Sequence, residues 1–373
     1  MNFSFSDEQE QLRSTLRRLL SERASSERLR EILETDDRVD RTLWSLLAGQ
    51  LGLLGLGIPE EYGGAGFGPV ETTVVFEELG RALAAVPYFS TIGLAVNALL
   101  AADDEAARKD LLPGIADGST LATLAISERG GDGGIDLAAV TTTAAGGDGT
   151  WRLTGEKAFV TDGVSADLVL VVARSEAGLG LFAVAGDAEN LARENMAPLD
   201  LTRPLARIRF EGTPARLVGA EGAAEPGLRV ALDRAVAALA AEQAGGAARC
   251  LDMAVEYAKV REQFGRPIGS FQAIKHKAAD MMVRVETAKS AAYYAAWAAA
   301  DSSSEASLAS ALAAAYCADA YVDVAAENIQ IHGGIGYTWE HDAHLYFRRA
   351  KSSQLLFGTP ETHRDRLAAL VGI

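Results

Sequence analysis

The stretch that decides the fold reads REQFGRPIGSFQ and covers residues 261–272. It joins two predicted helices, from Leu228 to Arg261 and from Phe271 to Ala300, which are dense in alanine and have strong helix propensity. Ser270 is a plausible N-cap for the second helix. A third long helix is predicted from Leu308 to Ile331. The last part of the chain, from Gly227 to the end, is therefore interpreted as helical.

Upstream of this helical zone, the chain changes from a helical pattern to a β pattern. From Ser6 to about Gly118 the pattern is helical, and Ser6 followed by Gln9 forms a capping-box start. From Leu121 to about Gly219, alternating polarity and turn signals predict strands.

Two of the predicted strands run from Leu168 to Val172 and from Leu205 to Phe210, and residues 212–214 (GTP) are expected to close the second. Helical, β and helical zones in this order predict an α+β protein with an antiparallel middle domain. The absence of βαβ alternation argues against a doubly wound nucleotide-binding sheet. The predicted domain boundaries are 1–120, 121–222 and 223–373.

Composition and charge exclude several kinds of partner. The 373 residues include 35 Lys and Arg against 51 Asp and Glu, a net charge of -16, which disfavours nucleic acid and anionic membrane surfaces. No hydrophobic stretch is expected to reach the length that crosses a bilayer, and the N-terminus lacks the pattern of a signal peptide. Cys250 and Cys317 are too few for a disulfide framework or a zinc site. A cytoplasmic protein is expected.

Two motifs contain residue types that can bind phosphate. Residues 330–338 read QIHGGIGYT, and their glycines would let backbone N–H groups approach an anion closely. The motif is not a GxGxxG fingerprint, and it can equally be a glycine C-cap with a turn. In residues 261–272, Arg261 and Arg266 could hold phosphate and Gln272 could bond a carbonyl or hydroxyl, or the stretch is a linker with solvated arginines.

Together with PEEYGG at residues 59–64 and the helix–β–helix order, these motifs resemble the acyl-CoA dehydrogenase family over essentially the whole chain. The resemblance implies an N-terminal helical domain, a middle antiparallel β domain and a C-terminal four-helix bundle. It also implies FAD bound between subunits of a homotetramer or dimer of dimers, an acyl-CoA substrate, and an electron-transfer flavoprotein as acceptor.

The resemblance also assigns cofactor contacts to positions of this sequence. Ser127, Phe159 and Thr161 match residues beside the flavin ring. Positions that match contacts to the pyrophosphate and adenosine of the neighbouring subunit's FAD are Arg261, Phe264, Gln272, Gln330, Gly333 and Gly334. Thr359 matches a further cofactor contact.

The family reaction is α,β-dehydrogenation, in which a carboxylate removes the Cα proton of the thioester. The family places this glutamate directly before the Gly-Thr of the C-terminal motif, where this chain has Phe357, or at a position that falls here at about Ala235. Glu242 lies two helical turns, about 10 Å, beyond Ala235 and is the remaining candidate base. The alternative is that Glu242 is structural or paired with an arginine.

A second departure is the loop from Glu128 to Asp136, where Arg129 replaces the proline of the family pattern and the expected serine is missing. Both departures fit a branch of the family in which two different subunits form α2β2 enzymes acting on bulky acyl-CoA substrates such as sterol side chains. In that alternative, this chain is a catalytically silent subunit that completes the FAD site. His341 and His344 have no apparent third ligand, so no metal site is expected.

Overall fold

The computed structural model describes residues 5–128, 135–147, 149–301 and 303–373. Packing divides the chain into two compact units. The first, which we call the helical unit, comprises Met1–Glu31, Thr73–Ala84 and Val236–Ile373; the second, the β unit, comprises Ile32–Thr72 and Ala85–Ala235. The loop residues 129–134 lie outside the described part, so the replacement at Arg129 is not placed.

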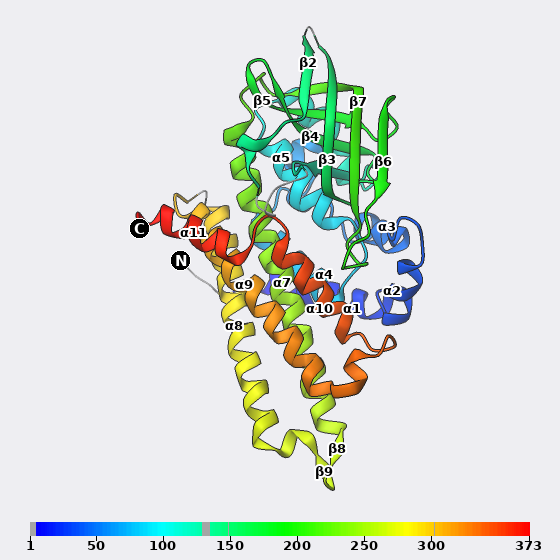
Figure 1. Ribbon diagram of the computed structural model, residues 1–373, viewed down its shortest axis with the longest axis vertical. Helices are drawn as coiled ribbons and strands as arrows, with labels where there is room; N and C mark the ends of the chain where they lie inside the picture. Colours follow the sequence, from blue (N-terminus) through cyan, green and yellow to red (C-terminus); the bar gives the residue numbers. More distant parts are fainter. Residues whose placement is uncertain (1–4, 129–134, 148, 302) are drawn as a thin grey trace. The chain divides into compact units, whose positions relative to one another are not determined.

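The helical unit is built from long helices that bring distant parts of the sequence together (Figure 1). Its elements are α1 (Asp7–Arg23), most of α2 (Ser26–Leu33), α4 (Pro69–Ala82) and α7 (Glu225–Val260), α8 (Gln272–Ala300), α9 (Ala306–His332), α10 (Ala343–Leu355) and α11 (Pro360–Leu370). Helix α9 packs against α8, α10 and α11. The capping box at Ser6 and Gln9 is confirmed, and the three predicted long helices agree with α7, α8 and α9 within a few residues.

Small residues allow the helices of this unit to approach closely. A Cβ atom on Gly245 of α7 would overlap the carbonyl oxygen of Glu77 of α4, and one on Gly246 would overlap the ring of Tyr321 of α9. Alanine lines much of the remaining contact surface. The alanine-rich sequence therefore serves tight helix packing as well as helix propensity.

The β unit contains strands β1 (Ala122–Ala125), β2 (Thr143–Gly147), β3 (Thr150–Thr161), β4 (Leu168–Ser175), β5 (Gly178–Ala185), β6 (Leu191–Asn195) and β7 (Leu205–Val218). The pairings run β4–β2–β3–β7–β5 and return from β5 to β4, so the sheet closes on itself. The ladders are antiparallel except that β1 and β2 each pair with β4 in parallel. The core includes Trp151, Phe182 and Phe210. The helices of this unit are α3 (Arg41–Gly49), α5 (Asn97–Ala101) and α6 (Glu105–Ala116), with a π-helical turn at Phe89–Val96.

Two local predictions were wrong. Strand β7 does not end at residues 212–214: the register shift against β3 and the left-handed Gly212 (φ 74°) show a bulge that lets the strand continue to Val218. Ser270 does not cap α8, since the N-cap residue is Phe271 and the Ser270 hydroxyl lies buried without a hydrogen-bond partner among the described residues.

The expectation about hydrophobic stretches also needs correction. Among the described residues, one helical segment, Ala306–Tyr337, is long and apolar enough to cross a membrane by length and composition. Its many alanines raise the hydropathy without bulky side chains. Since 67% of its most apolar window is buried inside the structure, the segment has the character of a core helix, which passes the same test.

Candidate functional site

A bulge in β3 shapes the edge of the β unit where the flavin contacts are predicted. Lys157 pairs with Ile208 of β7 and Val160 pairs with Ala206, so the ladder is interrupted at Ala158 and Phe159. The freed N–H of Ala158 donates instead to the carbonyl oxygen of Ser127, at 2.9 Å. The bulge therefore joins β3 to the segment that follows β1.

The structure brings the three predicted flavin contacts together. Phe159 has a left-handed backbone (φ 57°) and its ring is 50% exposed, next to the half-buried Ser127. Thr161 lies two residues further along β3, and its carbonyl oxygen accepts a hydrogen bond from the Thr123 hydroxyl of β1, at 2.7 Å. The Thr161 side chain is buried, whereas Ser127 and Phe159 are open to a ligand.

Sequence reasoning missed the buried lysine beneath this edge. The Lys157 side chain has no exposed surface, and its ammonium donates to the Ile126 carbonyl and to the Glu128 carboxylate. Burial lowers the pKa of Lys157 to about 8, and the bond to Glu128 limits the fall. The available signal was the two-residue period of β3, which places Lys157 on the same buried face as Trp151 and Leu153. A lysine on such a face needs a partner, since lysines are almost never fully buried unless they are paired.

In the helical unit, the stretch 261–272 forms an exposed arm. Strands β8 (Glu262–Gln263) and β9 (Arg266–Pro267) pair around a two-residue turn, Phe264 and Gly265, in which both φ angles are positive. The Phe264 ring is 93% exposed at the tip, and Arg261 and Gln272 are exposed at the base of the arm. The Phe264 ring contacts the Phe271 ring edge to face, with 6.1 Å between centroids.

The glycine motif lies beside this arm. Gly333 ends α9 with φ 62° and ψ −137°, a conformation that essentially only glycine adopts. His332 is buried, bonds to the Asn328 carbonyl at 2.8 Å, and stacks on the ring of Tyr257 of α7, with 4.4 Å between ring centroids. Because the Tyr257 carbonyl accepts the N–H of Arg261, this stack holds the turn next to the arm.

The helical unit thus brings most of the predicted pyrophosphate and adenosine contacts to one region. Gln330, Gly333 and Gly334 are exposed, and a Cβ atom on either glycine would meet nothing within 4 Å, so the backbone is open to an external group. These residues suit a dinucleotide, because arginine, amide and open backbone donors are what a pyrophosphate requires. Thr359 has a different evident role: it is the N-cap of α11 and its hydroxyl accepts the N–H of Thr362.

The candidate base is already paired. Glu242 of α7 and Arg349 of α10 form an ion pair at 2.7 Å, and their side chains are only 8% and 5% exposed. The two positions to which the family resemblance assigns the glutamate hold Ala235, which is buried, and Phe357, which is partly buried and has a left-handed backbone (φ 67°). The geometry favours the structural alternative for Glu242, and its assignment as the base stays a prediction.

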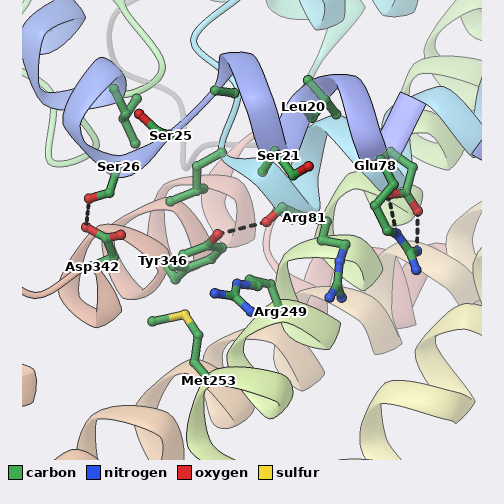
Figure 2. A pocket seen from close by; sticks show the side chains of 15 residues that line it. Leu20, Ser21, Ser25, Ser26, Glu78, Arg81, Arg249, Met253, Asp342 and Tyr346 are labelled. Carbon is green, nitrogen blue, oxygen red and sulfur yellow. Dashed lines mark hydrogen bonds and ion pairs between the residues drawn. The ribbon is translucent and has the colours of Figure 1, made fainter. Parts of the chain in front are cut away.

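A pocket of about 470 Å³ lies among α1, α2, α4, α7 and α10, and none of the residues that line it is a predicted site residue (Figure 2). The arginine side chains that line it already pair with carboxylates. Arg17 bonds both carboxylate oxygens of Glu78, at 2.8 and 2.6 Å, Arg81 pairs with Asp252, and Arg249 pairs with Glu256. We therefore assign no ligand to this pocket.

The two histidines considered as metal ligands make local contacts. His341 accepts the N–H of Ala343, and His344 stacks on Trp339 and bonds its carbonyl oxygen. Within residues 5–128, 135–147, 149–301 and 303–373, no group of three or more His, Cys, Asp or Glu side chains is arranged to hold a metal ion.

Comparison with known proteins identifies the family of the chain. Models of the acyl-CoA dehydrogenase N-terminal, middle and C-terminal domains match residues 6–119, 123–212 and 228–372. The chain is 35% identical over 372 residues to acyl-CoA dehydrogenase IpdE2 of Mycolicibacterium smegmatis, covering 98% of this chain and 99% of the relative.

Two solved structures are similar over almost their whole length. One belongs to the ChsE4-ChsE5 complex from Mycobacterium tuberculosis (TM-score 0.89, 30% identity, 100% of this chain and 99% of that chain). The other is described as the Tcur3481-Tcur3483 steroid ACAD (TM-score 0.88, 35% identity, 98% of each chain). The chain belongs to the acyl-CoA dehydrogenase family.

Proposed function

We propose that this chain takes part in FAD-dependent α,β-dehydrogenation of an acyl-CoA thioester, and that the electrons pass to an electron-transfer flavoprotein. The supporting observation is that most of the residues matched to FAD contacts, all except Thr161 and Thr359, lie in two open regions of the chain. FAD, when bound, supplies the hydride acceptor. The chain's own residues supply binding and orientation.

Each open region has a distinct role in this proposal. Ser127 and Phe159 orient the flavin ring at the edge of the β unit. The exposed arm with Phe264 and the Gly333–Gly334 turn bind the pyrophosphate and adenosine of a neighbouring subunit's FAD. The Phe264 ring contacts Phe271 edge to face but stays 93% exposed, which supports a role across a subunit boundary.

A second candidate function is favoured by the missing base. Ala235 and Phe357 carry no proton-accepting group, and Glu242 is held by Arg349. In this reading the chain completes the FAD site of an α2β2 enzyme, and a paralogous subunit supplies the carboxylate. The similar structures ChsE4-ChsE5 and Tcur3481-Tcur3483 each name two proteins, which supports such an assembly. The second is a steroid ACAD, which supports a bulky polycyclic acyl group as the substrate.

The test is to purify the chain alone and co-expressed with a base-bearing paralogue, and to count FAD by native mass spectrometry. Acyl-CoA is then added and flavin bleaching is followed. Bleaching by the chain alone would exclude the second candidate. Stoichiometric FAD and bleaching that appear only on co-expression would support it, and failure of every preparation to bind FAD would refute both.

A matched variant sharpens the distinction. Phe357→Glu places a carboxylate directly before Gly358, the position that the family resemblance assigns to the base. If only the base is missing, this variant should bleach its flavin with acyl-CoA where the unaltered chain does not. Phe357→Gln, which has the same shape without the charge, is the control.

A further inference from the structure

The buried lysine of β3 contacts both residues that flank Ser127. The Lys157 ammonium donates to the Ile126 carbonyl at 2.9 Å and to Glu128 Oε1 at 2.7 Å. Its side chain has no exposed surface. Burying a charge costs folding free energy unless the charge is paired and hydrogen-bonded. The Lys157 ammonium meets this condition through its bonds to Ile126 and Glu128.

The Glu128 carboxylate is fully engaged. Besides Lys157, its Oε1 accepts from the backbone N–H of Thr142 at 2.9 Å and from the Thr142 hydroxyl at 2.7 Å. Its Oε2 accepts from the backbone N–H of Thr141 at 2.8 Å and from the Thr141 hydroxyl. Burial alone would raise the pKa of Glu128, but the bonds from Lys157, Thr141 and Thr142 outweigh it and lower the pKa to about 2.

These bonds act on both sides of the flavin contacts. Ile126, Ser127 and Glu128 are each bonded to Lys157 or to Ala158, and Glu128 also ties this segment to the residues that lead into β2. Phe159 follows Ala158 in the bulge, so the bonds of Lys157 and Ala158 to residues 126–128 also restrict the position of Phe159. One lysine–glutamate pair therefore fixes Ser127 relative to Phe159.

We propose that Lys157 and Glu128 are positioning residues that hold Ser127 and Phe159 in one arrangement for the flavin ring. Neither acts on the flavin directly. This inference rests on the proposed FAD function. Its physical reason is that a binding site needs its contacts locked by supporting hydrogen bonds, because side chains left to move bind more weakly and less precisely.

The test uses the full chain, assembled with its base-bearing partner where FAD binding requires it, as wild type and as Lys157→Met. Lys157→Met should weaken FAD binding by about tenfold or more and shift the absorption spectrum and reduction potential of the flavin that remains bound. Measured without FAD, amide hydrogen exchange at Thr141 and Thr142 should accelerate. Arg152→Met is the matched control, since it removes a half-exposed cation from the same strand.

The outcomes separate this inference from the function on which it rests. Wild-type and Lys157→Met chains with equal FAD affinity, spectrum and exchange would overturn the positioning role alone. A wild-type chain that takes up no FAD in any preparation would overturn the proposed function and this inference with it. Where Lys157→Met does not fold, Thr141→Val removes a single hydroxyl donor from an exposed residue, and it should produce the same changes at about two- to fivefold.

Discussion

Mutation of the Glu242–Arg349 pair can show whether Glu242 is structural or catalytic. A structural Glu242 predicts a loss of folding stability, and a catalytic Glu242 predicts a loss of flavin reduction. Arg349→Met removes the cation that pairs with the Glu242 carboxylate, in a site where Glu242 is only 8% exposed. Removing one partner of a buried ion pair costs about 3–5 kcal/mol of folding free energy. Glu242→Gln keeps an acceptor oxygen for Arg349, so its cost is smaller, about 1.5–3 kcal/mol.

Urea unfolding of the wild type, both single variants and the double variant measures these costs. With a slope of about 3 kcal/mol/M, Arg349→Met should lower the midpoint by about 1 M or more. The double variant should lose less folding free energy than the sum of the losses of the two single variants. Each single variant leaves one charge of the pair in place, and the double variant removes both charges. Arg348→Met is the control: its guanidinium lies over the Trp339 ring, 5.1 Å from the centroid, and its loss should cost no more than about 1 kcal/mol.

Activity completes the test. If Glu242 is structural, Glu242→Gln in the assembled enzyme loses stability yet reduces its flavin with acyl-CoA at an unchanged rate. Unchanged stability together with abolished flavin reduction would refute this reasoning and restore Glu242 as the base.

Three further predictions concern other parts of the chain. Gly245→Ala should destabilise the chain by at least about 1–3 kcal/mol in thermal or urea unfolding, because the added methyl overlaps the Glu77 carbonyl, while Gly147→Ala, whose Cβ meets no atom within 4 Å, should be nearly neutral. Because the folded-state pKa of Glu128 lies below its usual value, the stability that Glu128 contributes is complete above about pH 4.5 and is lost as the pH falls towards about 2, so acid unfolding of Glu128→Gln should depend less on pH over that range. Phe264→Ser should leave the unfolding temperature of the chain unchanged, since the ring is 93% exposed, but should weaken FAD binding in the assembled enzyme by about tenfold, as measured by fluorescence titration.

Local signals predicted much of the fold. Alanine-rich runs predicted α7, α8 and α9 nearly to the residue, because helix propensity and helix ends depend on neighbours in sequence. The two wrong predictions also rested on local signals, but contacts beyond those signals determined the outcome. The Gly212 turn signal became a bulge because β7 pairs with β3 on both sides of it, and Ser270 lost its capping role to the hairpin and 3-10 turn that precede α8.

In the candidate site, too, motifs identified the residues, and only the fold brought them together. Arg261, Phe264, Gln272 and the Gly333–Gly334 turn could be identified as cofactor contacts, because their motifs are contiguous in the chain and match a family pattern. That the turn is held next to the arm depends on the stack of His332 on Tyr257, and Tyr257 lies outside both motifs.

By itself, the sequence determined the helix–β–helix order, the family and the absence of a carboxylate at positions 235 and 357. Only the tertiary structure decided that Glu242 is paired with Arg349, 107 residues away, and that Lys157 reaches back to Glu128. The physical reason is that an ionic side chain carries the same local signature whether it is solvated or buried. Its partner is chosen by how distant segments pack, and sequence spacing does not encode that choice.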